Sequence, residues 1–136
     1  SSWFLPRLIG IDKALELCYT GKVISAEEAL EINLISEVLP QEKLIERALE
    51  IAKEFTAESS QISIALTRQM MWRMLGADDP MEAHKIDSRA IFELGQSGEA
   101  IEGVTSFLEK RSPTFPGKVS KDMPSFFPWW NEKEFE

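Results

Sequence analysis

The sequence is poor in the residue types on which several common kinds of site depend. Its 136 residues include one cysteine, Cys18, and one histidine, His84. A single cysteine cannot form an intrachain disulfide, and it indicates a reducing compartment, by default the cytoplasm. This content also excludes the common Cys/His zinc sites, so no metal ligand is predicted. No apolar run approaches the roughly 20 residues of a membrane-spanning helix, and no secretory signal peptide is visible.

Basic residues are also scarce. The chain has 15 Lys and Arg residues against 23 Asp and Glu residues, a formal net charge of −8. This balance weighs against a nucleic-acid partner, which requires a net basic face. The hydrophobic share of 43% and the charged share of 28% are typical of a globular domain, and the length suits a single one.

The first residues are unusual for a terminus. The chain starts at Ser1 without a methionine and is largely apolar from Trp3 onward, whereas chain ends are usually polar and frayed. Two interpretations fit equally well. Either these residues belong to a longer protein, or the start has been trimmed.

Helical periodicity dominates the first 111 residues and predicts a mainly α fold of five or six helices with little or no sheet. Ser25 and Glu28 form a capping box, and Asn33 suits the left-handed end of the helix that follows it. Residues 34–39 are short and apolar and could form one extended segment. The expected helices cover residues 11–20, 25–32, 41–56, 60–75, 80–94 and 99–110.

Residues 112–136 differ in composition from the rest. They contain four prolines and no helical or strand period. They are also rich in large rings, whereas disordered tails are poor in aromatics. We therefore expect a helical region over 1–111 and an extended, aromatic-rich tail over 112–136 that docks on its own surface or a partner's. The six rings are Phe115, Phe126, Phe127, Trp129, Trp130 and Phe135.

Few residues suggest chemistry. There is no glycine-rich phosphate loop and no nucleophile elbow. His84 shares a helical face with Met81 and Ile91, so a packed or hydrogen-bonded role is favoured over that of a base. Cys18 lies on the apolar face of its helix and is expected in the core. No catalytic residue is predicted.

Residues 110–121 contain four basic residues and no acid, so they carry +4 while the rest of the chain carries −12. Such a patch on an acidic protein can hold an anion such as a phosphate. The alternative is a helix end followed by a solvated loop. The four residues are Lys110, Arg111, Lys118 and Lys121.

The order of several short motifs resembles the C-terminal half of the crotonase superfamily, the enoyl-CoA hydratases and isomerases. The resemblance covers residues 1–117, and it lies in the joint order and spacing of the motifs. They are Ser2-Trp3-Phe4-Leu5-Pro6-Arg7, Ile24-Ser25-Ala26-Glu27-Glu28-Ala29-Leu30, Leu34-Ile35-Ser36-Glu37-Val38, Glu102-Gly103-Val104 and Phe107-Leu108-Glu109-Lys110-Arg111-Ser112-Pro113-Thr114-Phe115.

The resemblance implies an N-terminal β/α spiral followed by this helical region. In the family, the spiral carries the backbone amides of the oxyanion hole and the catalytic glutamates, the last of them just before the segment that matches Ser1-Ser2-Trp3. The chain would then start downstream of the chemistry and would lack the donors that contribute most to catalysis. Alone, it is expected to be catalytically silent.

The resemblance also implies two CoA contacts. Phe107 matches the aromatic residue near the adenine of a CoA bound to a neighbouring subunit, and Lys110 matches the lysine that meets the CoA phosphates. Phe107 is also in phase with Ala100 and Val104, so a place in the core is the alternative. No covalently bound cofactor is expected, and a CoA thioester would be the substrate of the complete enzyme.

The family usually assembles as trimers or dimers of trimers through this region, so self-association is expected. Asn33 stands where a glycine is common, and Glu99 where an aspartate is usual. Two functions are therefore considered. One is the C-terminal portion of an enoyl-CoA hydratase/isomerase-like enzyme of fatty acid metabolism, which contributes to assembly, the acyl-pocket wall and CoA binding. The other is a free-standing, non-catalytic assembly or binding module derived from that fold.

Overall fold

The computed structural model describes residues 2–132, 134 and 135, and within them it is helical without a strand. The expected mainly α class is confirmed. Contacts between residues group the chain into two compact units, residues 1–48 and 49–136. The helices are α1 (Leu5–Ile9), α2 (Ile11–Thr20), α3 (Ala26–Glu31), the 3₁₀ helix η1 (Gln41–Lys43), α4 (Leu44–Ala57), α5 (Gln61–Met74), α6 (Pro80–Gly95) and α7 (Gly98–Glu109).

The described residues contain seven α-helices, whereas the sequence predicts five or six. The additional one is α1, a single turn whose five residues are too few for a helical period to be visible. Pro6 lies in its first turn, where a missing N–H costs nothing. Residues 34–39 form bends and irregular backbone rather than a strand.

The predicted helix ends hold because local side chains satisfy the free backbone groups. The Glu28 amide donates to Ser25 Oγ over 3.1 Å, and the Ser25 amide donates to Glu28 Oε2 over 2.8 Å, which completes the capping box. Asn33 follows with a φ of 58°. Ser60 and Asp79 cap α5 and α6 through one bond each, in which the side chain accepts the amide of Ser63 or of Met81.

In the first unit, α1 packs on α2, and Gly10 between them has a φ of 81°. Ala14 is buried in α2. The core position expected for Cys18 is wrong, because this residue is exposed. The five residues of α1 are too few to cover both ends of the ten-residue α2, so an apolar position near its C-terminus stays open.

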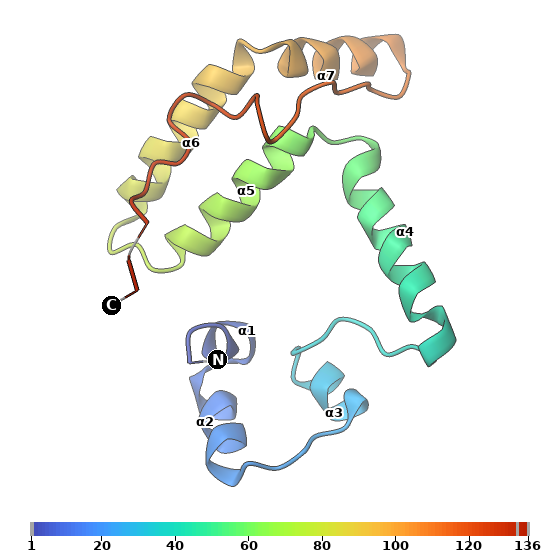
Figure 1. The fold of residues 1–136 in the computed structure, drawn as a ribbon, viewed down its shortest axis with the longest axis vertical. Coiled ribbons are helices and arrows are strands. Elements are labelled where there is room, and N and C mark those ends of the chain that lie inside the picture. The colour runs from blue at the N-terminus through green and yellow to red at the C-terminus, as the bar shows by residue number, and fades with distance from the viewer. Residues whose placement is uncertain (1, 133, 136) are drawn as a thin grey trace. The chain divides into compact units, whose positions relative to one another are not determined.

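In the second unit, α5 and α6 form a hairpin, and α7 continues from α6 after a short break (Figure 1). The core of this unit is formed by Leu66 of α5, Ala90 of α6 and Phe126 of the tail. Only 6% of Phe126 is exposed. Six further apolar residues pack around these three: Met70, Ile86, Leu94, Met123, Phe127 and Trp129.

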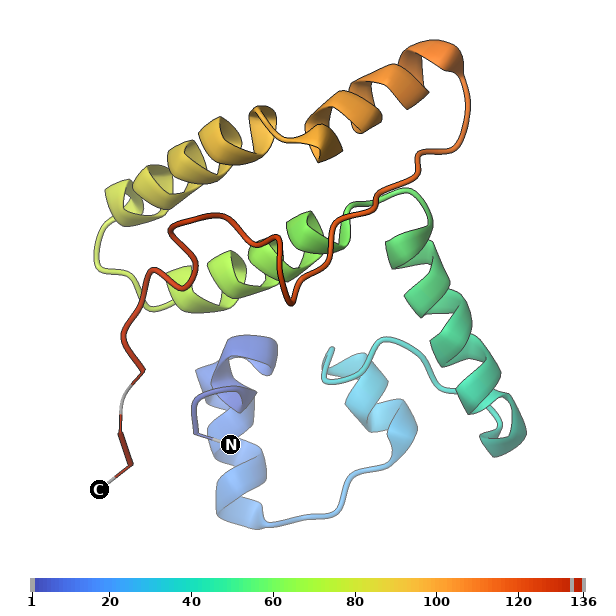
Figure 2. The same cartoon turned by 45° about the horizontal axis from the view of Figure 1, so that its top comes forward.

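Three glutamates hold the tail through its backbone. The amide of Thr114 donates to Glu102 over 2.7 Å, and that of Gly117 donates to Glu99 over 2.9 Å. Ser125 donates its amide and its hydroxyl to the two carboxylate oxygens of Glu93. Because the glutamates come in reverse order along the chain, the tail runs antiparallel to α7 and α6, as Figure 2 shows.

Aromatic rings hold the distal part of the tail. Phe127, Trp129 and Trp130 contact one another edge to face at centroid distances of 4.8 to 6.3 Å. The Arg73 guanidinium of α5 lies 3.3 Å from the ring centroid of Trp130, and that of Arg89 lies 4.8 Å from Phe126. Such cation–π contacts attach the rings to both helices of the hairpin.

Candidate functional site

The C-terminal turn of α7 contains both predicted CoA contacts. Lys110 follows the helix with a φ of 54° and a ψ of 42°, in the left-handed region. Its amide donates to the Phe107 carbonyl, and the Arg111 amide donates to the Ser106 carbonyl over 3.1 Å. These two bonds form a Schellman motif, in which glycine is the usual left-handed residue. A lysine there carries a backbone cost that glycine would avoid.

Phe107 lies one turn before Lys110 and does not pack in a core of this chain, because 82% of it is exposed. The outward side of α7 also carries Ile101, Val104 and Leu108, all largely exposed. The inward side carries Ser106, which is buried, and Gly103, which lies against the ring of Phe115. The helix therefore turns its small residues inward and its large apolar residues outward.

The four predicted basic residues do not form one free patch. Arg111 is paired with Glu102 through two bonds, of 2.6 and 2.9 Å, and with Glu109 at 2.7 Å. The Arg111 guanidinium and the Thr114 amide hold the pKa of Glu102 at about 2. The Lys110 ammonium makes no hydrogen bond or ion pair with the part of the chain that the structure describes. Its ammonium is therefore available to an anion.

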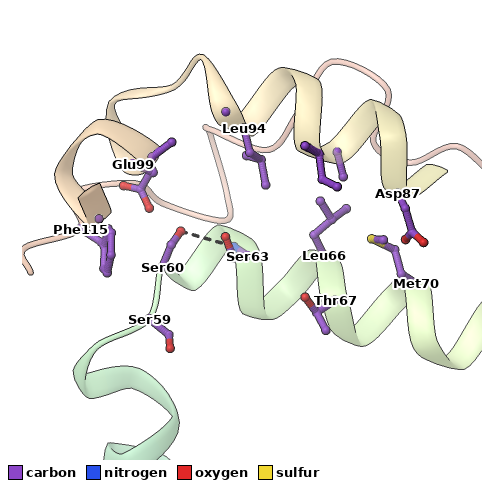
Figure 3. Close-up of a pocket in the computed structure, with 15 residues that line it drawn as sticks. Ser59, Ser60, Ser63, Leu66, Thr67, Met70, Asp87, Leu94, Glu99 and Phe115 are labelled. Carbon is purple, nitrogen blue, oxygen red and sulfur yellow. Dashed lines mark hydrogen bonds between the residues drawn. The ribbon is translucent and has the colours of Figure 1, made fainter. Parts of the chain in front are cut away.

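A groove of about 610 Å³ lies between α5, α6 and α7 (Figure 3). Leu66 points from α5 towards α6, and Leu94 points from α6 towards α5. Glu99 and Phe115 lie at one end and Asp87 at the other. Hydroxyl groups of Ser63 and Thr67 line the α5 side. A volume of this size suits a small apolar ligand or part of a larger one.

Glu99 closes one end of this groove and is not available as a general base there. Its Oε1 accepts the Gly117 amide, and its Oε2 is buried without a hydrogen-bond partner. A Cβ on Gly117 would lie 2.5 Å from Ile62 and 2.8 Å from the Glu99 carboxylate. The tail therefore approaches the helices so closely at this position that any larger residue would require the Ile62 and Glu99 side chains to move.

The tail-binding role of Glu93, Glu99 and Glu102 was not expected from the sequence. Glu99 and Glu102 are three residues apart and so share a helix face, which is the available signal. Nothing in the proline-rich tail shows which amides they bind. His84 is exposed on α6 and its side chain makes no hydrogen bond with the described residues, contrary to the packed or hydrogen-bonded role expected for it.

Among the described residues, no group of three or more His, Cys, Asp or Glu side chains could hold a metal ion. None of the helices in the described part of the chain is both long and apolar enough to cross a membrane.

Comparison with known proteins shows relatives over most of the chain. The family described as enoyl-CoA hydratase/isomerase matches residues 1–118. Enoyl-CoA hydratase ACTT3 of Alternaria alternata is 42% identical over 116 residues, which are 85% of this chain and 38% of that protein. The 1,2-epoxyphenylacetyl-CoA isomerase of Escherichia coli is 32% identical over 123 residues, 86% of this chain and 44% of the relative.

Solved structures show the same relationship as the related sequences. The enoyl-CoA hydratase from Bacillus anthracis superposes with a TM-score of 0.77 at 34% identity, covering 84% of this chain and 43% of that one. The helices thus match the helical portion of a crotonase fold. The chain belongs to the enoyl-CoA hydratase/isomerase family. It spans about two fifths of the length of these relatives.

Proposed function

We propose that this chain acts as the C-terminal portion of an enoyl-CoA hydratase/isomerase-like enzyme on acyl-CoA thioesters, within fatty acid metabolism in the cytoplasm. The complete enzyme would be a lyase or an isomerase. The chain would contribute CoA contacts, a wall of the acyl pocket and a surface for assembly. By itself it would be silent, because the family's oxyanion hole and catalytic glutamates belong to the preceding spiral.

The observation that carries the proposal is the turn at the end of α7. Lys110 adopts a left-handed conformation there, and its ammonium is unpaired among the described residues. Strained backbone of this kind tends to persist where a side chain serves a function. The exposed Phe107 ring lies on the preceding turn and offers a flat surface for a nucleobase. Together they suit the phosphates and adenine of CoA.

The groove between α5 and α6 supports a part in the acyl pocket. It is lined mainly by apolar side chains, with Leu66, Leu94 and Phe115 among them. Its volume of about 610 Å³ suits a hydrocarbon chain lying between the carboxylates of Glu99 and Asp87 at its two ends.

The outward face of α7 supports assembly. Ile101, Val104 and Leu108 are each more than half exposed, and contiguous apolar surfaces of this kind usually mark interaction sites. We propose that copies of the enzyme associate through this helical region as trimers or dimers of trimers. Sedimentation of the complete enzyme as a monomer, with α7 still accessible to apolar dyes, would contradict this part.

The test of the CoA contact is Lys110→Ala in the complete enzyme. The contact is remote from the reacting carbons, so the variant should raise KM for an enoyl-CoA about tenfold and change kcat less than twofold. An enoyl-pantetheine substrate lacks the nucleotide, so its KM should not change. Lys85→Ala serves as a control, because that lysine lies outside the α7 turn. An unchanged KM for the CoA ester would overturn the assignment.

The alternative is a free-standing, non-catalytic assembly or binding module. The observation that favours it is the core that the second unit forms with its own tail, where Phe126 packs on Leu66 and Ala90. Such a module would self-associate through α7 without binding CoA. Titration with CoA separates the two hypotheses. The enzyme portion should bind CoA through Lys110, whereas the module should not bind CoA.

A further inference from the structure

The left-handed conformation of Lys110 depends on contacts from neighbouring residues. A left-handed non-glycine residue is less favourable than the right-handed form, because its Cβ comes too close to the following carbonyl oxygen. The two Schellman bonds hold the backbone of this turn. A further set of contacts involves the residue that immediately follows Lys110.

Arg111 joins both ends of this turn. Its guanidinium donates to both carboxylate oxygens of Glu102, which lies inside α7, and to Glu109 at the last position of the helix. It also donates to the Ser112 carbonyl over 3.2 Å. The planar guanidinium thus spans two helix positions and the first residue of the tail. A bidentate pair restrains direction as well as distance, because two parallel bonds must hold together.

Glu102 extends this restraint into the tail. Its Oε1 accepts both Arg111 Nη1 and the Thr114 amide, over 2.6 and 2.7 Å. The side chain of Glu102 is 21% exposed, whereas that of Arg111 is 41% exposed. The carboxylate is therefore the more enclosed partner, and it ties the backbone on the far side of Lys110 to the helix before it. Lys110 lies between two anchored points, the end of α7 and Thr114.

We propose that Arg111 is a positioning residue for CoA binding. It holds Lys110 in the left-handed turn, so that the ammonium and the Phe107 ring are presented together at the end of α7. Arg111 does not itself bind the ligand phosphates, because four of its five N–H donors are already used, by two carboxylates and the Ser112 carbonyl. This inference rests on the proposed function, in which Lys110 meets the CoA phosphates.

The test uses Arg111→Met in the complete enzyme, a substitution that keeps much of the side-chain length and removes the charge and all donors. A misplaced ligand group can cost up to about a hundredfold, so a rise of about tenfold in KM for an enoyl-CoA is expected, with kcat within twofold. KM for the matching enoyl-pantetheine should not change. Glu102→Gln removes the other half of the pair and should raise KM in the same direction.

Arg47→Met is the matched control. Arg47 also donates to both carboxylate oxygens of a glutamate, Glu37, at 2.9 to 3.2 Å, in a pair that involves neither α7 nor the tail. Its loss should leave KM for both substrates unchanged. Thermal unfolding of each variant shows whether it is folded at the assay temperature. If Arg111→Met is not, Glu102→Gln carries the test.

A double-mutant cycle separates positioning from general stability. If Arg111 acts through Lys110, then Arg111→Met should raise KM less than twofold further in the Lys110→Ala background. Equal effects in both backgrounds would overturn the positioning role. A raised KM for Lys110→Ala with no effect of Arg111→Met would overturn it as well, while the proposed function stands. If Lys110→Ala alone leaves KM unchanged, the proposed CoA contact fails and the positioning role fails with it.

Discussion

Lys110 and Asn33 are the two non-glycine residues with positive φ in the described part of the chain, at 54° and 58°. Each follows a helix. Asparagine tolerates this region because its short amide can bond locally, whereas lysine has no such compensation. The strain at Lys110 is therefore the clearest sign that its side chain is kept for something other than the fold.

Replacing Lys110 by glycine should stabilise the chain. The strain that is removed exceeds the added entropy of the unfolded chain, so the free energy of unfolding should rise by about 0.5–1 kcal/mol. Thermal unfolding measures this, with Asn33→Gly as the control for which a smaller rise is expected. A fall in the melting temperature of Lys110→Gly would show that the lysine stabilises the turn.

The charge on Glu102 predicts a pH dependence. Its folded pKa is about 2 because Arg111 and the Thr114 amide bond to the carboxylate, whereas the ordinary pKa of a glutamate is 4.5. A lowered pKa contributes stability that is present above pH 4.5 and is lost as the pH falls towards 2. Glu102→Gln should therefore lose less stability than the wild type over this window. The midpoint of urea unfolding at pH 6, 4 and 3 measures it, and parallel losses would contradict the assignment.

Among the elements, helix bounds were the most predictable feature. Ser25, Ser60 and Asp79 begin helices as N-caps, and such local hydrogen bonds can be read directly from sequence. Helix α1, with five residues, is too short to be recognised from the sequence in this way. The apolar stripe of α7 was also visible, but whether it faces inward depends on Gly103 and Phe115, which are far apart in sequence.

Only the general character of the tail was predictable from the sequence. Its aromatic content indicated an extended segment rich in rings, but no period shows that Phe126 is buried while Phe135 is fully exposed. The same holds for the groove, whose walls come from three helices and from Phe115. Pairings between distant segments depend on tertiary packing, and local sequence carries little record of it.

Removing the Phe126 ring should destabilise the second unit. The ring packs on Leu66 and Ala90, and the loss of a buried phenylalanine side chain costs about 3 kcal/mol or more. Phe135→Ala is the matched control, since the same ring is removed where it is fully exposed. Urea unfolding followed by tryptophan fluorescence compares the two. Equal midpoints would mean that the tail does not dock as described.

At the scale of the whole molecule, the chain resolves into two units with small cores and much exposed apolar surface. Its relatives are about twice as long, and the family match ends at residue 118. The short motifs and their order were enough to predict the family. They could not predict the acyl chain or the reaction, since relatives include both a hydratase and an isomerase.

Three glutamates of α6 and α7 are used by the fold. Glu93, Glu99 and Glu102 accept backbone amides of the tail, so their carboxylates hold the tail in place. A general base must instead reach a proton of the substrate. This arrangement agrees with a chain that binds and assembles without carrying the chemistry.

The most direct test is the turnover of an enoyl-CoA by the purified 136-residue chain, with its helicity checked by circular dichroism. The account predicts a rate no higher than that of buffer, alongside measurable turnover by the complete enzyme. Saturable turnover by the helical 136-residue chain would contradict the account, because it would place catalytic groups within these residues.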